Sequence, residues 1–106
     1  MAVKYVSPAQ KTVTAAGTAE QLNSSDIRTP ALVVQALVDN AGNVFIGDSD
    51  VADGRGIELS PGQTIEFRPR DRNKSTDELV LSDIYVDAAA GNNGDGVSYI
   101  YEASRN

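Results

Sequence analysis

The amino-acid sequence predicts an all-β fold, an antiparallel β-sandwich of jelly-roll-like type with about seven to eight short strands. Short runs rich in Val, Ile, Thr and Tyr recur throughout the 106 residues. Clusters of Gly, Pro, Asn and Asp separate these runs at intervals of roughly 8 to 12 residues, a spacing typical of sandwiches and barrels. No segment shows the spacing of about 3.6 residues between apolar positions that an amphipathic helix requires.

Length and composition predict one domain with a modest core. A chain of this length buries about two thirds of the surface that it exposes when unfolded. Aromatic residues make up only 6% of the sequence and Trp is absent, so the core must come mainly from Val, Ile, Leu and Ala. We expect residues 11–106 to form a single β-sandwich domain and residues 1–10 to form an N-terminal arm or an edge strand. Domains of this size often gain stability by oligomerising.

The first quarter of the chain contains two candidate strands. Residues 11–16 are β-branched and weakly alternating, and this run stops at Gly17. Residues 20–22 are a possible short continuation before the polar stretch 23–26, which we interpret as a turn because Pro30 follows too closely for a helix to develop.

The segment 31–47 is the most apolar part of the sequence and is predicted to be its structural centre. In its first run both alternating sets of side chains are apolar except for Gln35, which favours a central strand covered on both faces by other strands or by a neighbouring subunit. The turn at residues 39–43 leads to a second strand ending at Gly47. This turn and the following loop, residues 48–56, are expected to be exposed.

The second half of the chain continues the alternation of short strands and turns. Val97, Tyr99 and Tyr101 share one face of the last strand and either face the core or form a tyrosine row at a subunit interface. Residues 69–78 are polar and predict a loop or an exposed hairpin end. The predicted strands lie at residues 57–59, 63–68, 79–81, 84–86 and 97–102, with strong turn signals at residues 60–62 and 92–96.

Charge and residue usage exclude several functional classes. The formal net charge of −6 disfavours general binding to a phosphate backbone. Without cysteine the chain has no disulfide and no thiolate metal site. No run of about 18 apolar residues predicts a membrane span, and the N-terminus lacks an apolar stretch of signal-peptide length. We therefore expect a soluble protein that binds neither nucleic acid nor membrane.

The absence of histidine argues against catalysis. Neither a Ser-His-Asp nor a Cys-His arrangement can be built, and an ordinary zinc or copper site lacks its ligands. Gly47-Asp48-Ser49 resembles the start of a hydrolase serine motif, but the chain has no histidine to activate Ser49. Paired carboxylates for glycoside hydrolysis would need a cleft and a stacking Trp. The sequence predicts a protein that is not an enzyme and has no cofactor.

The acidic loop contains Asp48, Asp50 and Asp53, and it lacks both the full ligand spacing and the flanking helices of an EF-hand. Asp53 is displaced by one position, and the twelfth residue counted from Asp48 is Leu59 where a Glu is needed. A structural cation is the alternative, but we interpret this segment as a solvated loop between strands. Its carboxylates are candidate partner contacts.

Four of the nine basic residues lie within a seven-residue strip, which is the only basic cluster in the sequence: Arg68, Arg70, Arg72 and Lys74. One hypothesis is that this strip docks on an acidic partner, for example on the acidic loop of a neighbouring copy. The alternative is an exposed loop whose charges discourage edge-to-edge aggregation. Together with the acidic loop, Tyr99 and Tyr101, the strip completes the set of candidate partner contacts.

A set of sequence blocks, taken in order from Lys11 to Ala103, resembles a group of small tailed-bacteriophage virion structural proteins, the capsid decoration or cement proteins. The resemblance lies in the ordered spacing of the blocks rather than in any single one of them. The blocks are residues 13–18, 21–22, 33–37, 45–51, 56–67, 81–88 and 94–103.

The resemblance implies a structural β-sandwich protein that binds and stabilises a capsid shell. It implies a homo-oligomer, specifically a homotrimer, whose other partner is the major capsid protein or another virion protein. The location would be the virion, after assembly in the host cytoplasm. The alternatives are the base of a head fibre, a neck or tail component, or a carbohydrate- or ligand-binding β-sandwich module that uses Asp48, Asp50 and Asp53.

Overall fold

A computed structural model describes residues 3–68 and 78–105, with side-chain surroundings described for residues 6–68 and 78–103. The predicted all-β class is confirmed. Its elements are β1 (Val3–Thr12), β2 (Glu20–Gln21), β3 (Arg28–Thr29), β4 (Leu32–Ala36), β5 (Val44–Gly47), β6 (Ile57–Leu59), β7 (Thr64–Phe67), β8 (Leu79–Val80), the 3₁₀ turn η1 (Leu81–Asp83), β9 (Tyr85–Ala88) and β10 (Gly96–Arg105).

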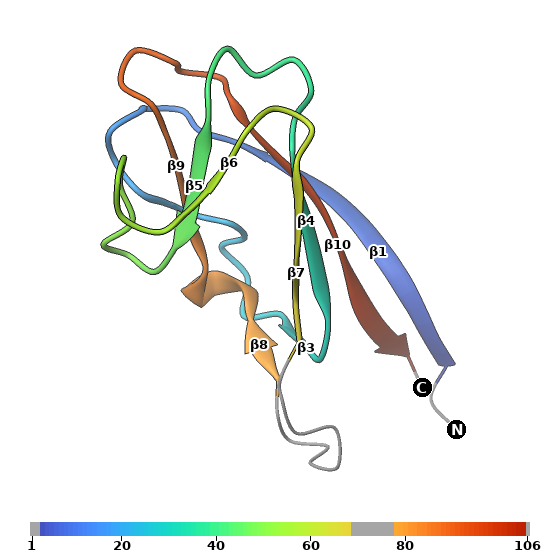
Figure 1. The fold of residues 1–106 in the computed structure, drawn as a ribbon. Coiled ribbons are helices and arrows are strands. Elements are labelled where there is room, and N and C mark those ends of the chain that lie inside the picture. Colours follow the sequence, from blue (N-terminus) through green and yellow to red (C-terminus); the bar gives the residue numbers. More distant parts are fainter. Residues whose placement is uncertain (1–2, 69–77, 106) are drawn as a thin grey trace.

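The strands form two four-stranded antiparallel sheets (Figure 1). Sheet A has the order β1-β10-β4-β7 and sheet B the order β2-β9-β5-β6, while β3 and β8 pair with each other as a small third sheet. The first strand, β1, pairs with the last, β10, in sheet A. The second strand, β2, pairs with the last but one, β9, in sheet B. This nesting is the double Greek key of a jelly roll, as predicted.

The hydrophobic core lies between sheets A and B. Alternation along β4 is regular, with Leu32, Val34 and Ala36 fully buried and the residues between them half-buried. The other buried apolar side chains of the core are those of Val13, Leu22, Val44, Ile46, Leu59, Leu81, Val86, Ala88, Val97 and Tyr99. Both sheets therefore contribute one apolar face to a single core.

The two apolar runs of segment 31–47 do not form a paired hairpin. β4 lies inside sheet A between β10 and β7, whereas β5 lies inside sheet B between β9 and β6. The prediction that other strands cover both faces of the first run is wrong, because Val33 and Gln35 on the opposite face of β4 stay partly exposed. The chain crosses from sheet A to sheet B between β4 and β5, so these two consecutive apolar runs pack across the core.

The edge-strand alternative for the N-terminus holds for the described residues, because β1 is the edge strand of sheet A. This strand pairs with β10 over its whole length, whereas β4 reaches only from Val97 to Tyr101 of β10. The β1–β10 ribbon consequently extends beyond the sandwich (Figure 1). The strand predicted at residues 11–16 ends at Thr12, because the chain then leaves sheet A for sheet B.

Pro8 lies in the middle of β1 without disturbing the ladder. The backbone N–H of Leu37 donates to Gly96 O and that of Glu102 donates to Ala31 O, so even-numbered residues of β10 bond toward β4. Because bonding alternates along a strand, the odd-numbered residues of β10 bond toward β1, and Pro8, opposite Ile100, directs its nitrogen to the free edge. The proline thus interrupts only the unpaired side of the strand.

The outer face of sheet B is covered by the chain itself. Phe45 points away from the core residues Val44 and Ile46, and yet only 2% of its surface is exposed. On the same face Asp87 is buried and accepts a hydrogen bond at 2.9 Å from the backbone N–H of Gly17 in the β1–β2 connection. The middle of the outer face of sheet B is therefore covered by the chain, whereas Glu58 on edge strand β6 is exposed on that face.

Candidate functional site

The connection between β4 and β5 is held rigidly at one end of the sandwich. Asn40 imitates a paired strand residue: its Nδ2 donates to Gly96 O at 2.9 Å, and its Oδ1 accepts from Gly96 N at 2.9 Å. The buried carboxylate of Asp95 accepts from the N–H groups of Ala41 at 2.9 Å and Gly42 at 3.0 Å. These contacts satisfy backbone groups that the turn would otherwise leave unpaired.

The acidic loop is stabilised by its own backbone. Asp48 Oδ1 accepts from the N–H of Asp50 at 2.9 Å, and Ala52 and Arg55 exchange two backbone hydrogen bonds around a turn that places Gly54 at a φ of 84°. Buried Val51 anchors the loop to the core. Asp48, Asp50 and Asp53 are exposed, and no group of three or more acidic residues in the described ranges is arranged to hold a metal ion.

Only one member of the predicted basic strip lies within the described residues. Arg68 is half-exposed, and its guanidinium forms an ion pair at 3.1 Å with Glu66, two residues earlier on the same face of the chain. Arg70, Arg72 and Lys74 lie outside the described residues.

Of the two candidate tyrosines, Tyr99 belongs to the core. It is 3% exposed. Its hydroxyl donates a hydrogen bond to Leu22 O at 3.3 Å and accepts one from Asn23 Nδ2 at 3.0 Å. The prediction that Tyr99 contacts a partner is therefore wrong, because its ring packs in the core and its hydroxyl is hydrogen-bonded inside the domain. Tyr101 stacks on it with ring centroids 6.2 Å apart and is half-buried, so part of its surface remains accessible.

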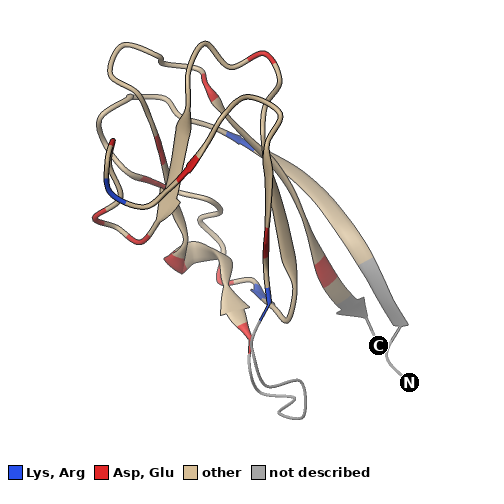
Figure 2. Ribbon diagram, viewed as in Figure 1, with Lys and Arg blue, Asp and Glu red and all other residues tan. Residues whose placement is uncertain are grey.

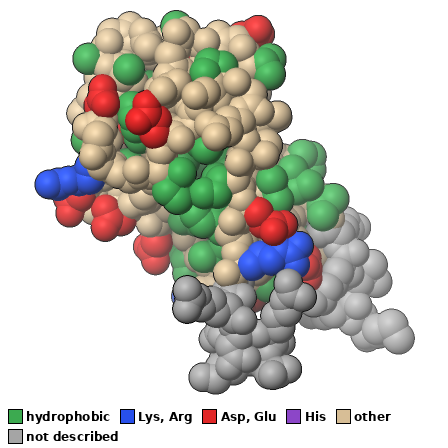
Figure 3. Space-filling model, viewed as in Figure 1, with side chains coloured by type: hydrophobic (Ala, Val, Ile, Leu, Met, Phe, Trp, Pro, Cys, Tyr) green, Lys and Arg blue, Asp and Glu red, His purple; other side chains and the backbone are tan. Residues whose placement is uncertain are grey.

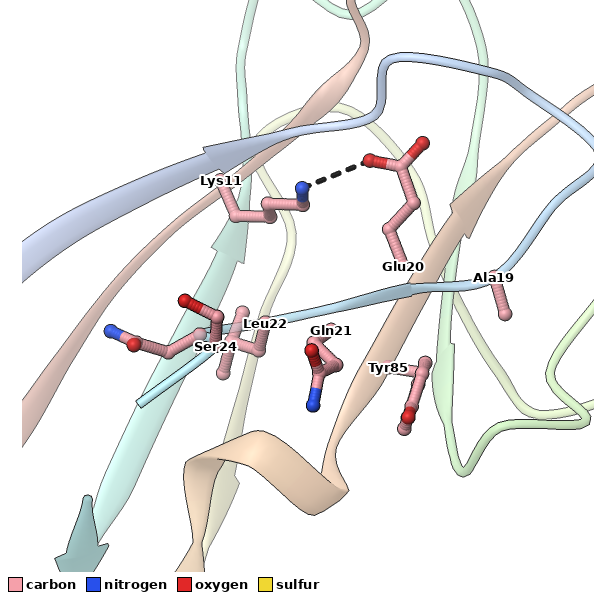
Figure 4. Close-up of a pocket in the computed structure, with 8 residues that line it drawn as sticks. Lys11, Ala19, Glu20, Gln21, Leu22, Ser24 and Tyr85 are labelled. Atoms are coloured by element: carbon pink, nitrogen blue, oxygen red, sulfur yellow. Dashed lines mark ion pairs between the residues drawn. The ribbon is translucent and has the colours of Figure 1, made fainter. Parts of the chain in front are cut away.

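A shallow groove of about 540 Å³ opens where edge strands β1 and β2 of the two sheets approach each other (Figure 4). Lys11 and Glu20 form an ion pair across it at 2.9 Å. Gln21 donates to Ser82 O, and Asn23 bonds both Tyr99 and the backbone of Ser25. The Lys11–Glu20 and Asn23–Tyr99 contacts join the two sheets, whereas Gln21 holds β2 to η1.

The carboxylate of Glu20 has a lowered pKa. Partial burial alone would raise the pKa of Glu20. Hydrogen bonds from the N–H groups of Ala15 and Thr14, together with the Lys11 ammonium, stabilise the charged form more strongly. The pKa of Glu20 therefore lies below its ordinary value of 4.5. The distances are 2.9 Å to Ala15 N and 3.0 Å to Thr14 N. Glu20 therefore clamps the β1–β2 connection that covers sheet B.

The outer face of sheet A presents a row of apolar side chains. The strand register aligns Pro8, Ile100 and Val33 across β1, β10 and β4, and Val6 is the next outward residue along β1. Val6 is 62% exposed and Ile100 41% exposed, while Pro8 is exposed and Val33 half-buried. We call these four residues the apolar row. The other outward residues whose side chains the structure describes are Gln10, Thr12, Ser98, Glu102, Gln35, Thr64 and Glu66.

Figure 3 shows hydrophobic side chains at the surface in the middle of the view and toward its right, where β10 and β1 of sheet A lie in Figure 1, with acidic and basic groups nearby. The remaining acidic residues are distributed over both sheets and several loops rather than gathered in one patch (Figure 2). No described helix is long and apolar enough to cross a membrane. Among the described residues, the apolar row on the outer face of sheet A is the candidate surface for interaction.

Comparison with known proteins returned no match among family models, curated proteins or solved structures. The sequence alone could not have found the apolar row, because its members come from three strands whose pairing is non-local. The alternation of Ile100 with Tyr99 and Tyr101 was a signal for one outward position, but Val6 and Val33 lay in runs whose exposed side was undetermined.

Proposed function

We propose that this chain is a non-enzymatic structural protein of a tailed-bacteriophage virion, a capsid decoration or cement protein that binds and stabilises the shell as a homo-oligomer. The observation that carries the assembly role is the open outer face of sheet A with its exposed apolar side chains, whereas the chain itself covers the middle of the outer face of sheet B. Sequence resemblance supplies the virion location, the trimeric state and the major capsid protein as partner.

The physical basis of such a role is a rigid body with a fixed binding face. Asn40, Asp95 and Glu20 hold the connections between strands, so little conformational entropy is lost when the surface is occupied. Many copies on a symmetric lattice convert weak single contacts into avidity. A modest apolar face is sufficient for this purpose.

The alternative virion positions are the base of a head fibre, the neck and the tail. A carbohydrate- or ligand-binding module is less well supported, because the polar groups of Gln21 and Asn23 in the described groove already bond within the domain. Asp48 and its neighbours form a loop that closes through its own backbone.

The test is to locate the chain by cryo-electron microscopy in particles assembled with and without its gene. We expect additional density on the capsid surface that disappears with the gene and returns when purified protein is added to the depleted particles. Density confined to the neck, the tail or a head fibre would replace decoration with one of the other virion positions. A chain absent from purified particles would overturn the proposal.

A further inference from the structure

We infer that the outer face of sheet A, centred on the apolar row of Val6, Pro8, Val33 and Ile100, is the surface through which copies of this chain bind one another. This inference rests on the proposed homo-oligomer and specifies its contact. Of the four large apolar side chains exposed in the described residues, two lie on this face, Val6 and Ile100. The other two, Val38 and Ile57, lie elsewhere.

Charge favours a second copy as the occupant of this face. Each chain has a net charge of −6, so two copies repel each other except where few acidic groups are brought together. Among the outward residues of sheet A that the structure describes, only Glu66 and Glu102 are acidic, and Glu66 is paired with Arg68. The face is thus the surface where self-association meets little repulsion.

The size of the face sets the expected strength of association. Four strands spaced about 4.8 Å apart and five residues long, together with the projecting β1–β10 ribbon, cover roughly 500 Å² in the plane of the sheet. A stable interface typically buries about 800 Å² on each partner. Copies should therefore associate weakly in solution and more completely on a lattice that concentrates them.

The free edge of β1 adjoins the apolar row and determines how the contact can close. Faces that meet each other give a two-fold dimer, whereas a face that meets the β1 edge of the next copy gives a heterologous contact. Such a contact forms a ring, such as the proposed trimer, when its rotation closes and an open filament when it does not. Pro8 lacks an N–H at the centre of that edge, which discourages open-ended strand addition.

The test is a matched pair of charge insertions in the purified full chain. Ile100 and Ile57 are 41% and 42% exposed, so Ile100→Glu and Ile57→Glu add the same charge at the same exposure on different surfaces. Sedimentation velocity from about 10 µM to 1 mM should show self-association of the wild type, as expected of a small interface. We expect Ile100→Glu to weaken it about tenfold or more through like-charge contact, and Ile57→Glu to stay within about twofold of the wild type.

A second pair keeps the test decisive if Ile100→Glu does not fold, as judged by circular dichroism. Val6→Glu, at a residue 62% exposed, should act like Ile100→Glu, and Val38→Glu, at a residue 72% exposed, should act like Ile57→Glu. Added NaCl should strengthen association by screening repulsion between the acidic chains, whereas docking of the basic strip on an acidic loop would weaken with salt.

A wild type that stays monomeric at every concentration would overturn the inference, as would equal effects of the two members of a pair. Either result leaves the virion proposal open, because that proposal is tested in particles. Conversely, a chain that associates through this face but is absent from virions would retain the inference and lose the virion role.

Discussion

Individual polar residues stabilise this domain by joining parts of the chain that are far apart in sequence. Asp95 and Asn40 connect the start of β10 to the β4–β5 connection, and Asp87 holds Gly17 over sheet B. Each of these groups bonds backbone N–H groups that have no strand partner. Buried polar groups of this kind are stable only when they are hydrogen-bonded, so their removal should be costly.

Glu20 makes stability depend on pH. Its folded-state pKa is lowered, so its contribution is present above the ordinary value of 4.5 and is lost as the pH falls through the folded-state pKa. We expect Glu20→Gln to lower the free energy of unfolding by about 1 kcal/mol at neutral pH, because a charged acceptor of backbone hydrogen bonds is lost. The difference should shrink in acid.

Urea unfolding of both proteins between neutral and acidic pH checks this expectation. Asp50→Asn, which neutralises an exposed carboxylate in the acidic loop, is the matched control and should show little effect at any pH. A Glu20→Gln deficit that persisted undiminished in strong acid would contradict the assignment of the effect to the carboxylate.

Val34 tests the assignment of one face of β4 to the core. It is fully buried opposite Tyr99 and Ile65, so Val34→Asp places an unpaired charge in the core and should prevent folding, a loss of about 5 kcal/mol or more. Gln35→Glu introduces a carboxylate on the opposite, partly exposed face of the same strand and should leave the fold intact. Soluble expression and circular dichroism distinguish the two, and a folded Val34→Asp protein would refute the core assignment.

At the scale of elements, the close approach of β1 and β10 depends on one glycine. A Cβ built on Gly96 would lie 2.1 Å from Lys11 O and 2.7 Å from Thr12 Cα, both of which are backbone atoms of the neighbouring strand. The strands cannot separate locally without breaking the ladder that β1 forms with β10. Space at this position, rather than backbone conformation, requires glycine.

We therefore expect Gly96→Ala to cost about 2 to 4 kcal/mol in thermal or denaturant unfolding. Gly42→Ala is the control: its Cβ would meet Asn92 Nδ2 at 2.6 Å, but this atom is the end of a side chain that can move aside. A loss at Gly96 no larger than the loss at Gly42 would show that the two strands have more freedom than the ladder implies.

The sequence predicted some strands better than others, because only some strands are specified by residues that are neighbours in the sequence. β4 follows an apolar run, and β6 and β7 follow turn chemistry or alternation that neighbouring residues display, so the sequence located them closely. The strand predicted at residues 97–102 was found as well, but β10 continues to Arg105 because it pairs with β1. β3 was missed because a two-residue strand has no periodicity, and it exists by pairing with β8. The acidic loop was correctly interpreted as an inter-strand loop because Asp and Gly favour turns wherever they occur.

At the scale of the whole molecule, the sequence by itself determined an all-β sandwich with one core, because strand periodicity, turn residues and the absence of a helical pattern are local properties. Only the tertiary structure decided that β4 and β5 belong to different sheets and that Tyr99 is buried. It also decided that the chain covers the middle of the outer face of sheet B and leaves that of sheet A open. Strand partners are chosen by the packing of distant segments around a common core. That choice determines which apolar residues remain on the surface, and hence where this protein can meet another.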